Sequence, residues 1–203
     1  MELHALVLAA GTGSRFGGRK LLAPWGTGVL LHGALEAACA APVASVIIVT
    51  GADADAVSSA ARAFATSNAP HMDQNIVHAL DYAAGLSASL RAGLAAVPPS
   101  ASGVFIFLGD MPRVPAAIST KLADAAKLCN ILAAAPVHDG RRGHPVLVAR
   151  SLFSRLLTLR GDEGARRILD ELGPALALVR TDDSGVLLDV DEVSDLARVG
   201  PKV

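Results

Sequence analysis

The chain has 203 residues, a formal net charge of −1 and aromatic side chains at 3% of its positions. The near-neutral charge excludes an evenly basic nucleic-acid binder and a polybasic membrane-surface protein, and the scarcity of aromatic rings excludes a platform that stacks several bases. The length predicts one domain, residues 1–203, whose core needs no disulfide or metal. No apolar run reaches the ~18 residues of a membrane span and no secretory leader is recognisable, so we expect a cytoplasmic protein.

Short apolar runs alternate along the chain with longer segments of helical periodicity. Strands are expected at 3–9, 43–50, 103–108, 130–135, 145–148 and 175–180, with a short late strand at 187–190. Helices are expected at 29–40, 53–65, 86–97, 115–128, 151–159 and 163–172. This alternation predicts a three-layer α/β/α, Rossmann-like fold with a mostly parallel sheet, in which ligands bind beyond the carboxyl ends of the strands.

The first expected strand runs into a glycine-rich, basic segment, AAGTGSRFGGRKLL at 9–22. Glycines let the backbone approach a ligand closely, and successive amide groups form concavities that bind anions. Arg15 and Lys20 add charges suited to phosphate oxygens. A G-x-G-x-x-G dinucleotide loop does not fit, because Phe16 stands at the third glycine position; a P-loop does not fit, because Leu21 follows Lys20. We therefore expect a different kind of phosphate-binding loop.

Acidic residues follow two other expected strands. Gly109 and Asp110 come directly after the strand at 103–108, and a carboxylate placed there can bind a divalent ion that faces the phosphates. Asp189 and Asp191 end the last expected strand and, two residues apart, would face the same side. We favour Asp191 over Asp189 as a second metal ligand. The alternative is a strand end followed by a helix that Asp191 or Ser194 caps.

The pattern LAAG-x-G-x-RFGG-x-KLL at 8–22 resembles the signature loop of the MobA-like nucleotidyltransferase family. Its Ala-Ala-Gly variant is most similar to the branch of molybdenum cofactor cytidylyltransferases. The resemblance runs from Leu3 to about Leu196 and implies the nucleotide-diphospho-sugar transferase-like fold, with the loop wrapped around a nucleotide triphosphate. The nucleotide contacts that it implies come from Ala9, Ala10, Gly11, Gly13, Arg15, Lys20, Ser87, Ser89 and Gly109.

Further segments resemble motifs of this family. The sequence GDMP at 109–112 implies that Asp110 binds Mg²⁺, with Mn²⁺ as the other candidate ion. The sequence DVD at 189–191 resembles the family's Asp-x-Asp motif and implies Asp191 as the second ligand. The sequence GLSASLRAG at 85–93 implies that its serines bond the base or ribose, with a plain helix cap as the alternative. The sequences RRGHP at 141–145 and GDEGAR at 161–166 imply acceptor contacts from Gly143, His144 and Arg166.

The implied reaction transfers CMP from CTP to the phosphate of a molybdopterin-type cofactor and releases pyrophosphate. Arg15, Lys20 and Asp110 would act on the phosphates without a protein nucleophile. Transient contact with a recipient molybdoenzyme or its chaperone is also implied. The alternatives are a guanylyltransferase that uses GTP, a transferase with another phosphate acceptor, and a non-catalytic nucleotide-binding partner in molybdoenzyme maturation. The non-catalytic alternative stays open because this chain departs from two family motifs. The family's Asn-Pro is replaced by His78-Ala79, and its Thr-Pro by Glu192-Val193.

Overall fold

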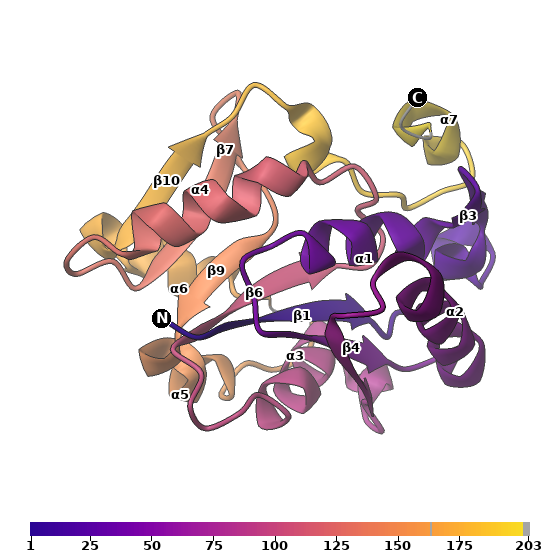
Figure 1. Ribbon diagram of the computed structural model, residues 1–203, viewed down its shortest axis with the longest axis horizontal. Helices are drawn as coiled ribbons and strands as arrows, with labels where there is room; N and C mark the ends of the chain where they lie inside the picture. Colours follow the sequence, from indigo (N-terminus) through magenta and orange to yellow (C-terminus); the bar gives the residue numbers. More distant parts are fainter. Residues whose placement is uncertain (163, 201–203) are drawn as a thin grey trace.

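The computed structural model describes residues 1–162 and 164–200. Within them an eight-stranded sheet has the order β10-β7-β9-β6-β1-β4-β5, with β8 paired to β7 (Figure 1). The strands are β1 Leu3–Ala9, β4 Ser45–Thr50, β5 Asp73–His78, β6 Gly103–Leu108, β7 Ala133–His138, β8 Arg141–Arg142, β9 Val146–Ala149 and β10 Leu176–Arg180. A separate hairpin joins β2 Pro24–Trp25 to β3 Gly28–Val29.

Strand β9 runs against the direction of its neighbours. The pairings among β6, β1, β4 and β5 are parallel, as is that of β7 with β10, whereas β9 is antiparallel to both β6 and β7. Val146 at the start of β9 pairs with Ile106 near the end of β6. The residues before β9 therefore lie at the end of the sheet where the parallel strands have their carboxyl ends. The residues that follow β1, β4 and β6 lie at this same end.

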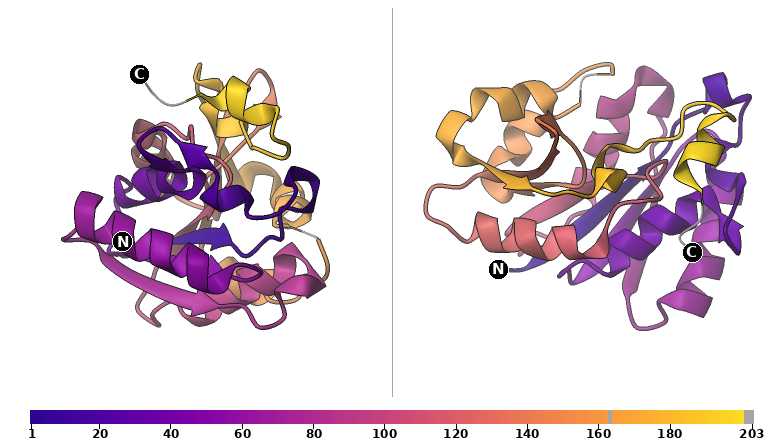
Figure 2. Two further views of the ribbon diagram at one scale, coloured as in Figure 1. Left: turned by 90° about the vertical axis from the view of Figure 1, so that its right-hand side faces the viewer. Right: turned by 90° about the horizontal axis from the view of Figure 1, so that it is seen from above.

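Helices cover both faces of the sheet, as Figure 2 shows. One apolar cluster joins the sheet to α1 Leu30–Cys39, α2 Ala54–Asn68 and α4 Ala116–Ala126. The other cluster joins it to α3 Leu86–Ala95, α5 Phe153–Leu156 and α6 Arg166–Glu171. Helix α7, Asp195–Val199, packs against the β2–β3 hairpin. The 3-10 helices are Ser14–Phe16, Lys20–Leu22, Tyr82–Ala84, Arg150–Leu152, Gly173–Ala175 and Ser184–Leu187. No described helix is long and apolar enough to cross a bilayer.

The predicted three-layer α/β fold with a mostly parallel sheet is confirmed. The expected late strand at 187–190 is wrong, because a 3-10 helix occupies 184–187 and the side chain of Asp183 accepts a hydrogen bond from the amide of Gly185 at 2.8 Å. The edge strand β5 was missed, because its sequence DQNIVH is half polar. The expected helix 163–172 is observed from Arg166 onward, and Glu163 lies outside the described residues.

Candidate active site

The glycine-rich loop leaves the end of β1 and folds back onto Lys20. Gly13 has φ 60°, and a Cβ added there would lie 2.9 Å from the Cβ of Lys20. The carbonyl of Gly13 accepts hydrogen bonds from the amides of Phe16 and Gly18, each at 3.0 Å. At Gly11 an added Cβ would meet nothing within 4 Å, so the space above this backbone is open. The loop therefore presents bare backbone beside a lysine, as a phosphate site requires.

Two basic side chains of this loop pair with two carboxylates from distant parts of the chain. The Nζ atom of Lys20 lies 2.7 Å from Asp110 Oδ2 and 3.5 Å from Asp191 Oδ1. Arg15 Nη1 lies 2.9 Å from Asp191 Oδ2. The Lys20 side chain is only 13% exposed and that of Asp110 24%, whereas Arg15 is exposed. The structure thus brings the predicted catalytic residues together and joins Asp191 to them, while Asp189 is exposed.

Asp195 holds the segment that carries Asp191. Its Oδ2 accepts hydrogen bonds from the amides of Asp191 at 2.8 Å and Glu192 at 2.9 Å. These two bonds lower the pKa of Asp195. Within the described residues, no side chain caps α7 through a hydrogen bond, so the helix cap by Asp191 or Ser194 that the sequence offered is not observed. Asp195 instead bonds two amides that precede the helix. The sequence signal for these two bonds is an aspartate four residues beyond Asp191, because short polar side chains often bond nearby backbone amides.

The two carboxylates near Lys20 suit a divalent ion that is bound together with the phosphates of a nucleotide. No group of three or more His, Cys, Asp or Glu side chains that could hold a metal occurs in the described ranges 1–162 and 164–200. Two carboxylates, Asp110 and Asp191, converge on the single ammonium of Lys20. Mg²⁺ usually binds one or two protein carboxylates together with substrate phosphate oxygens. The pair therefore fits a nucleotide-borne ion better than an all-protein metal cage.

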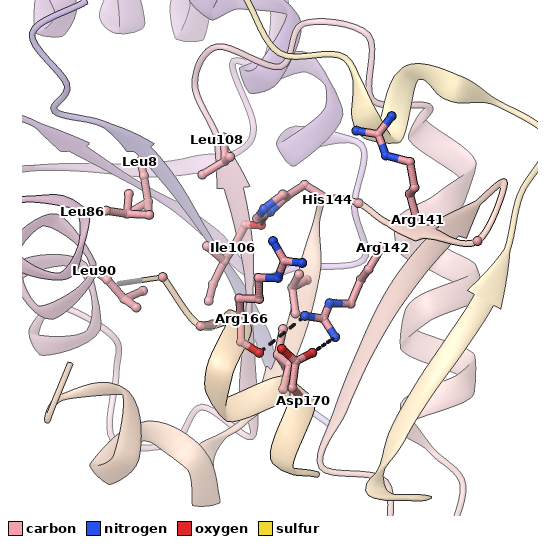
Figure 3. Close-up of a pocket in the computed structure, with 16 residues that line it drawn as sticks. Leu8, Leu86, Leu90, Ile106, Leu108, Arg141, Arg142, His144, Arg166 and Asp170 are labelled. Carbon is pink, nitrogen blue, oxygen red and sulfur yellow. Dashed lines mark hydrogen bonds and ion pairs between the residues drawn. The ribbon is translucent and has the colours of Figure 1, made fainter. Parts of the chain in front are cut away.

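A pocket of about 560 Å³ adjoins these groups at the same sheet edge (Figure 3). Aliphatic side chains form one wall and basic ones the other. The residues of the aliphatic wall include Leu8, Leu86, Leu90, Ile106 and Leu108. The polar wall includes Arg141, Arg142, Gly143, His144, Arg166 and Asp170. The predicted acceptor residues thus line one pocket: Gly143 and His144 come from the loop before β9, and Arg166 comes from α6.

The loop before β9 is fixed by backbone contacts. The amide of Gly143 donates to the carbonyl of Pro136 at 2.9 Å, and that of His144 donates to the carbonyl of Val186 at 2.9 Å. An added Cβ on Gly143 would lie 2.2 Å from that Val186 oxygen, so no larger residue fits there. His144 Nδ1 lies 3.3 Å from the carbonyl oxygen of Ile106. Since a carbonyl only accepts, Nδ1 carries the proton and Nε2 of the neutral ring is an acceptor.

The two serines of α3 are buried at the helix start. Ser87 is 0% and Ser89 4% exposed. Ser87 Oγ accepts a hydrogen bond from Arg91 Nη1 at 3.2 Å, and its amide donates to the carbonyl of Gly161 at 3.1 Å. Asp162 Oδ1 lies 3.4 Å from the Leu86 amide and so faces the start of α3. Direct nucleotide contacts by these hydroxyls stay a prediction.

The profile of the MobA-like NTP transferase domain matches residues 5–176. The chain belongs to this family of nucleotidyltransferases. The MobA-like chain is 29% identical over 193 residues to the molybdenum cofactor cytidylyltransferase of Escherichia coli K12, across 95% of this chain and 93% of that protein. It is 30% identical over 201 residues to the nicotine blue oxidoreductase of Paenarthrobacter nicotinovorans, across 96% and 94% of the two chains.

One of the similar solved structures is a manganese complex. Rv0371c of Mycobacterium tuberculosis H37Rv, in complex with manganese, aligns with this MobA-like chain at a TM-score of 0.78 and 28% identity, over 98% of this chain and 97% of that one. The family assignment and the nucleotidyltransferase fold predicted from the sequence are confirmed.

Protonation of His144 is expected to destabilise the fold. Burial lowers the pKa of His144 in the folded state, and burial of His32 acts in the same direction. The unfolded chain, with the ordinary histidine pKa of about 6.5, then binds protons first as the pH falls, so the free energy of unfolding decreases from about pH 7 downward. We expect His144→Gln to flatten this decrease in urea unfolding measured between about pH 7 and pH 5.

A matched variant separates this effect from a general response to acid. His71→Gln removes an exposed histidine and should leave the pH dependence as it is in the unmodified protein. The assignment of a buried neutral imidazole would be overturned if His144→Gln and the unmodified chain lost stability equally over this range.

Proposed function

We propose that this chain transfers the CMP group of CTP to the phosphate of the molybdenum cofactor (molybdopterin), giving molybdopterin cytosine dinucleotide and pyrophosphate. The observation that carries the proposal is the meeting of Lys20, Asp110 and Asp191 beside the glycine-rich loop and the basic pocket. The name of the Escherichia coli relative supports the choice of CTP and of this acceptor.

The nucleotide triphosphate would lie along the glycine-rich loop. The backbone at Gly11 is open, and the backbone of Gly13 turns toward Lys20, so their amides suit phosphate oxygens. Arg15 and Lys20 would exchange their carboxylate partners for the β- and γ-phosphates and stabilise the charge on the departing pyrophosphate. Catalysis then depends on positioning and charge, with no covalent protein intermediate.

Asp110 and Asp191 would hold the divalent ion, Mg²⁺ with Mn²⁺ as a substitute. Such an ion neutralises negative charge on the phosphates when it is bound. Asp195 would keep Asp191 in place through its two backbone hydrogen bonds. The buried amide of Gly109 donates to the carbonyl of Leu8 at 2.9 Å and fixes the turn that directs Asp110 to the site.

The acceptor would occupy the pocket beside His144. Its aliphatic wall suits a flat organic ring, and Arg166 suits an anionic group. A phosphate oxygen of the acceptor attacks the α-phosphorus of CTP in line, and the bond from that phosphorus to the β-phosphate oxygen breaks. The nucleophile is already an anion, so the reaction would need no general base to deprotonate it.

Nucleotide choice can be tested by thermal unfolding with each nucleotide and Mg²⁺. A ligand at 100 times its Kd adds about 2.7 kcal/mol, which for a chain of this size raises the Tm by roughly 5–10 °C. We expect this rise with CTP and a much smaller one with GTP. A larger rise with GTP would assign the guanylyltransferase activity instead. Stabilisation by a redox cofactor alone would favour oxidoreduction, the activity named for the Paenarthrobacter relative.

A further inference from the structure

Arg142 joins the β8 strand to helix α6. Its Nη1 lies 2.8 Å from Asp170 Oδ1, and its Nη2 donates to the carbonyl oxygen of Arg166 at 3.4 Å. Both partners are on α6, at its first residue and one turn later. Figure 3 shows the guanidinium of Arg142 between these two contacts, at the base of the pocket. One side chain thus ties the basic wall of the pocket to the helix.

Arg166 differs from Arg142 in what its side chain contacts. Its guanidinium projects toward His144 in Figure 3, and within residues 1–162 and 164–200 it makes no ion pair or hydrogen bond. The charge of Arg142, by contrast, is balanced by Asp170. Arg166 is therefore a cation that faces His144 and is available to an anionic acceptor, whereas Arg142 is occupied with the helix.

The position of Arg166 depends on contacts made by other parts of the fold. Helix α6 has six residues, too few to be stable alone, because isolated helices of fewer than about 12 residues are marginal in water. Ile168 and Leu169 anchor its inner side in the apolar core. On the pocket side, the polar anchor is the contact of Arg142 with Asp170 and the Arg166 carbonyl.

We propose that Arg142 is a positioning residue for the acceptor. It holds the start of α6 so that the Arg166 guanidinium faces His144 across the pocket. The inference rests on the proposed function in one respect, namely that an anionic acceptor is what Arg166 binds. The holding of α6 itself is independent of that reaction.

The competing explanation is that Arg142 binds the acceptor directly. Asp170→Asn separates the two roles, because they predict effects of opposite sign. If Arg142 positions α6, loss of its partner weakens acceptor binding. If Arg142 is itself the ligand, release from Asp170 leaves a freer cation and strengthens acceptor binding.

The experiment measures KM for the molybdenum cofactor, KM for CTP and kcat in Arg142→Ala, Arg142→Lys and Asp170→Asn. We expect the acceptor KM to rise about tenfold in Arg142→Ala and Asp170→Asn, with the CTP KM within about twofold, because small displacements of binding groups carry large costs. Arg142→Lys, which keeps the charge and one contact, should recover part of the loss. Lys127→Ala is the matched control, since Lys127 makes an ion pair with Asp124 at 2.8 Å and neither residue lines the pocket.

Amide hydrogen exchange provides a second readout that needs no reaction. Residues 166–172 should exchange faster in Arg142→Ala and Asp170→Asn than in Lys127→Ala. If exchange rises but no nucleotidyl transfer occurs even in the unmodified protein, the proposed function fails and the positioning role stands. A lower acceptor KM in Asp170→Asn, unchanged exchange in both variants, or an equal KM rise in Lys127→Ala would overturn the positioning role.

Discussion

Replacing Asp110 by alanine is expected to lower kcat/KM by about 10³-fold or more and to leave the fold intact. Asp110 is the carboxylate that lies 2.7 Å from Lys20, directly after a central strand. Its removal takes away the principal proposed ligand for the ion that offsets phosphate charge. The fold should survive because Lys20 keeps a carboxylate partner, Asp191, whose Oδ1 lies 3.5 Å from the Lys20 Nζ atom.

Steady-state pyrophosphate release and thermal unfolding measure these two effects. Asp124→Ala is a suitable control, because Asp124 also pairs with a lysine, Lys127, at 2.8 Å, but does so on the surface of α4. The control should retain full turnover. Turnover of Asp110→Ala at the level of the unmodified protein would remove Asp110 from the metal site.

Lys20→Met should have two effects of opposite direction. It removes the cation proposed to bind the triphosphate, so kcat/KM for CTP should fall by about 10²-fold. It also removes the ammonium that lies between Asp110 and Asp191, so these carboxylates become free to bind a metal. Without nucleotide, the affinity for Mn²⁺ should therefore rise by about tenfold.

Mn²⁺ binding without nucleotide can be followed by electron paramagnetic resonance or calorimetry. Lys127→Met, which breaks the surface pair with Asp124, should change neither Mn²⁺ binding nor turnover. An Mn²⁺ affinity that is unchanged or weaker in Lys20→Met would show that Lys20 does not compete with the ion for the carboxylates.

The parts of the site that lie close together along the chain were predictable from the sequence. The strands β1, β4 and β6 are mostly apolar and almost wholly buried, and the phosphate loop and Asp110 follow two of them directly. Parallel strands place their carboxyl ends at one end of the sheet, so the loop and Asp110 were expected there together. The structure adds that β1 and β6 are adjacent strands. The meeting of Lys20 with Asp110 follows from that topology.

The contacts between irregular or exposed segments were not predictable in the same way. Asp191 reaches Lys20 from 171 residues away through a segment that forms no strand, so strand periodicity gave the wrong local structure there. The pair of Arg142 and Asp170 joins a two-residue strand to a short helix, and exposed charges carry no periodic signal. Only the folded arrangement shows which of several arginines is free to bind an acceptor.

The most direct test of the central claim is the fate of the α-phosphate of CTP. With α-labelled CTP, Mg²⁺ and molybdenum cofactor, the label should move into the cofactor, with one pyrophosphate released for each label transferred and none without the cofactor. Transfer from labelled GTP in place of CTP, or no transfer from either nucleotide, would contradict the account.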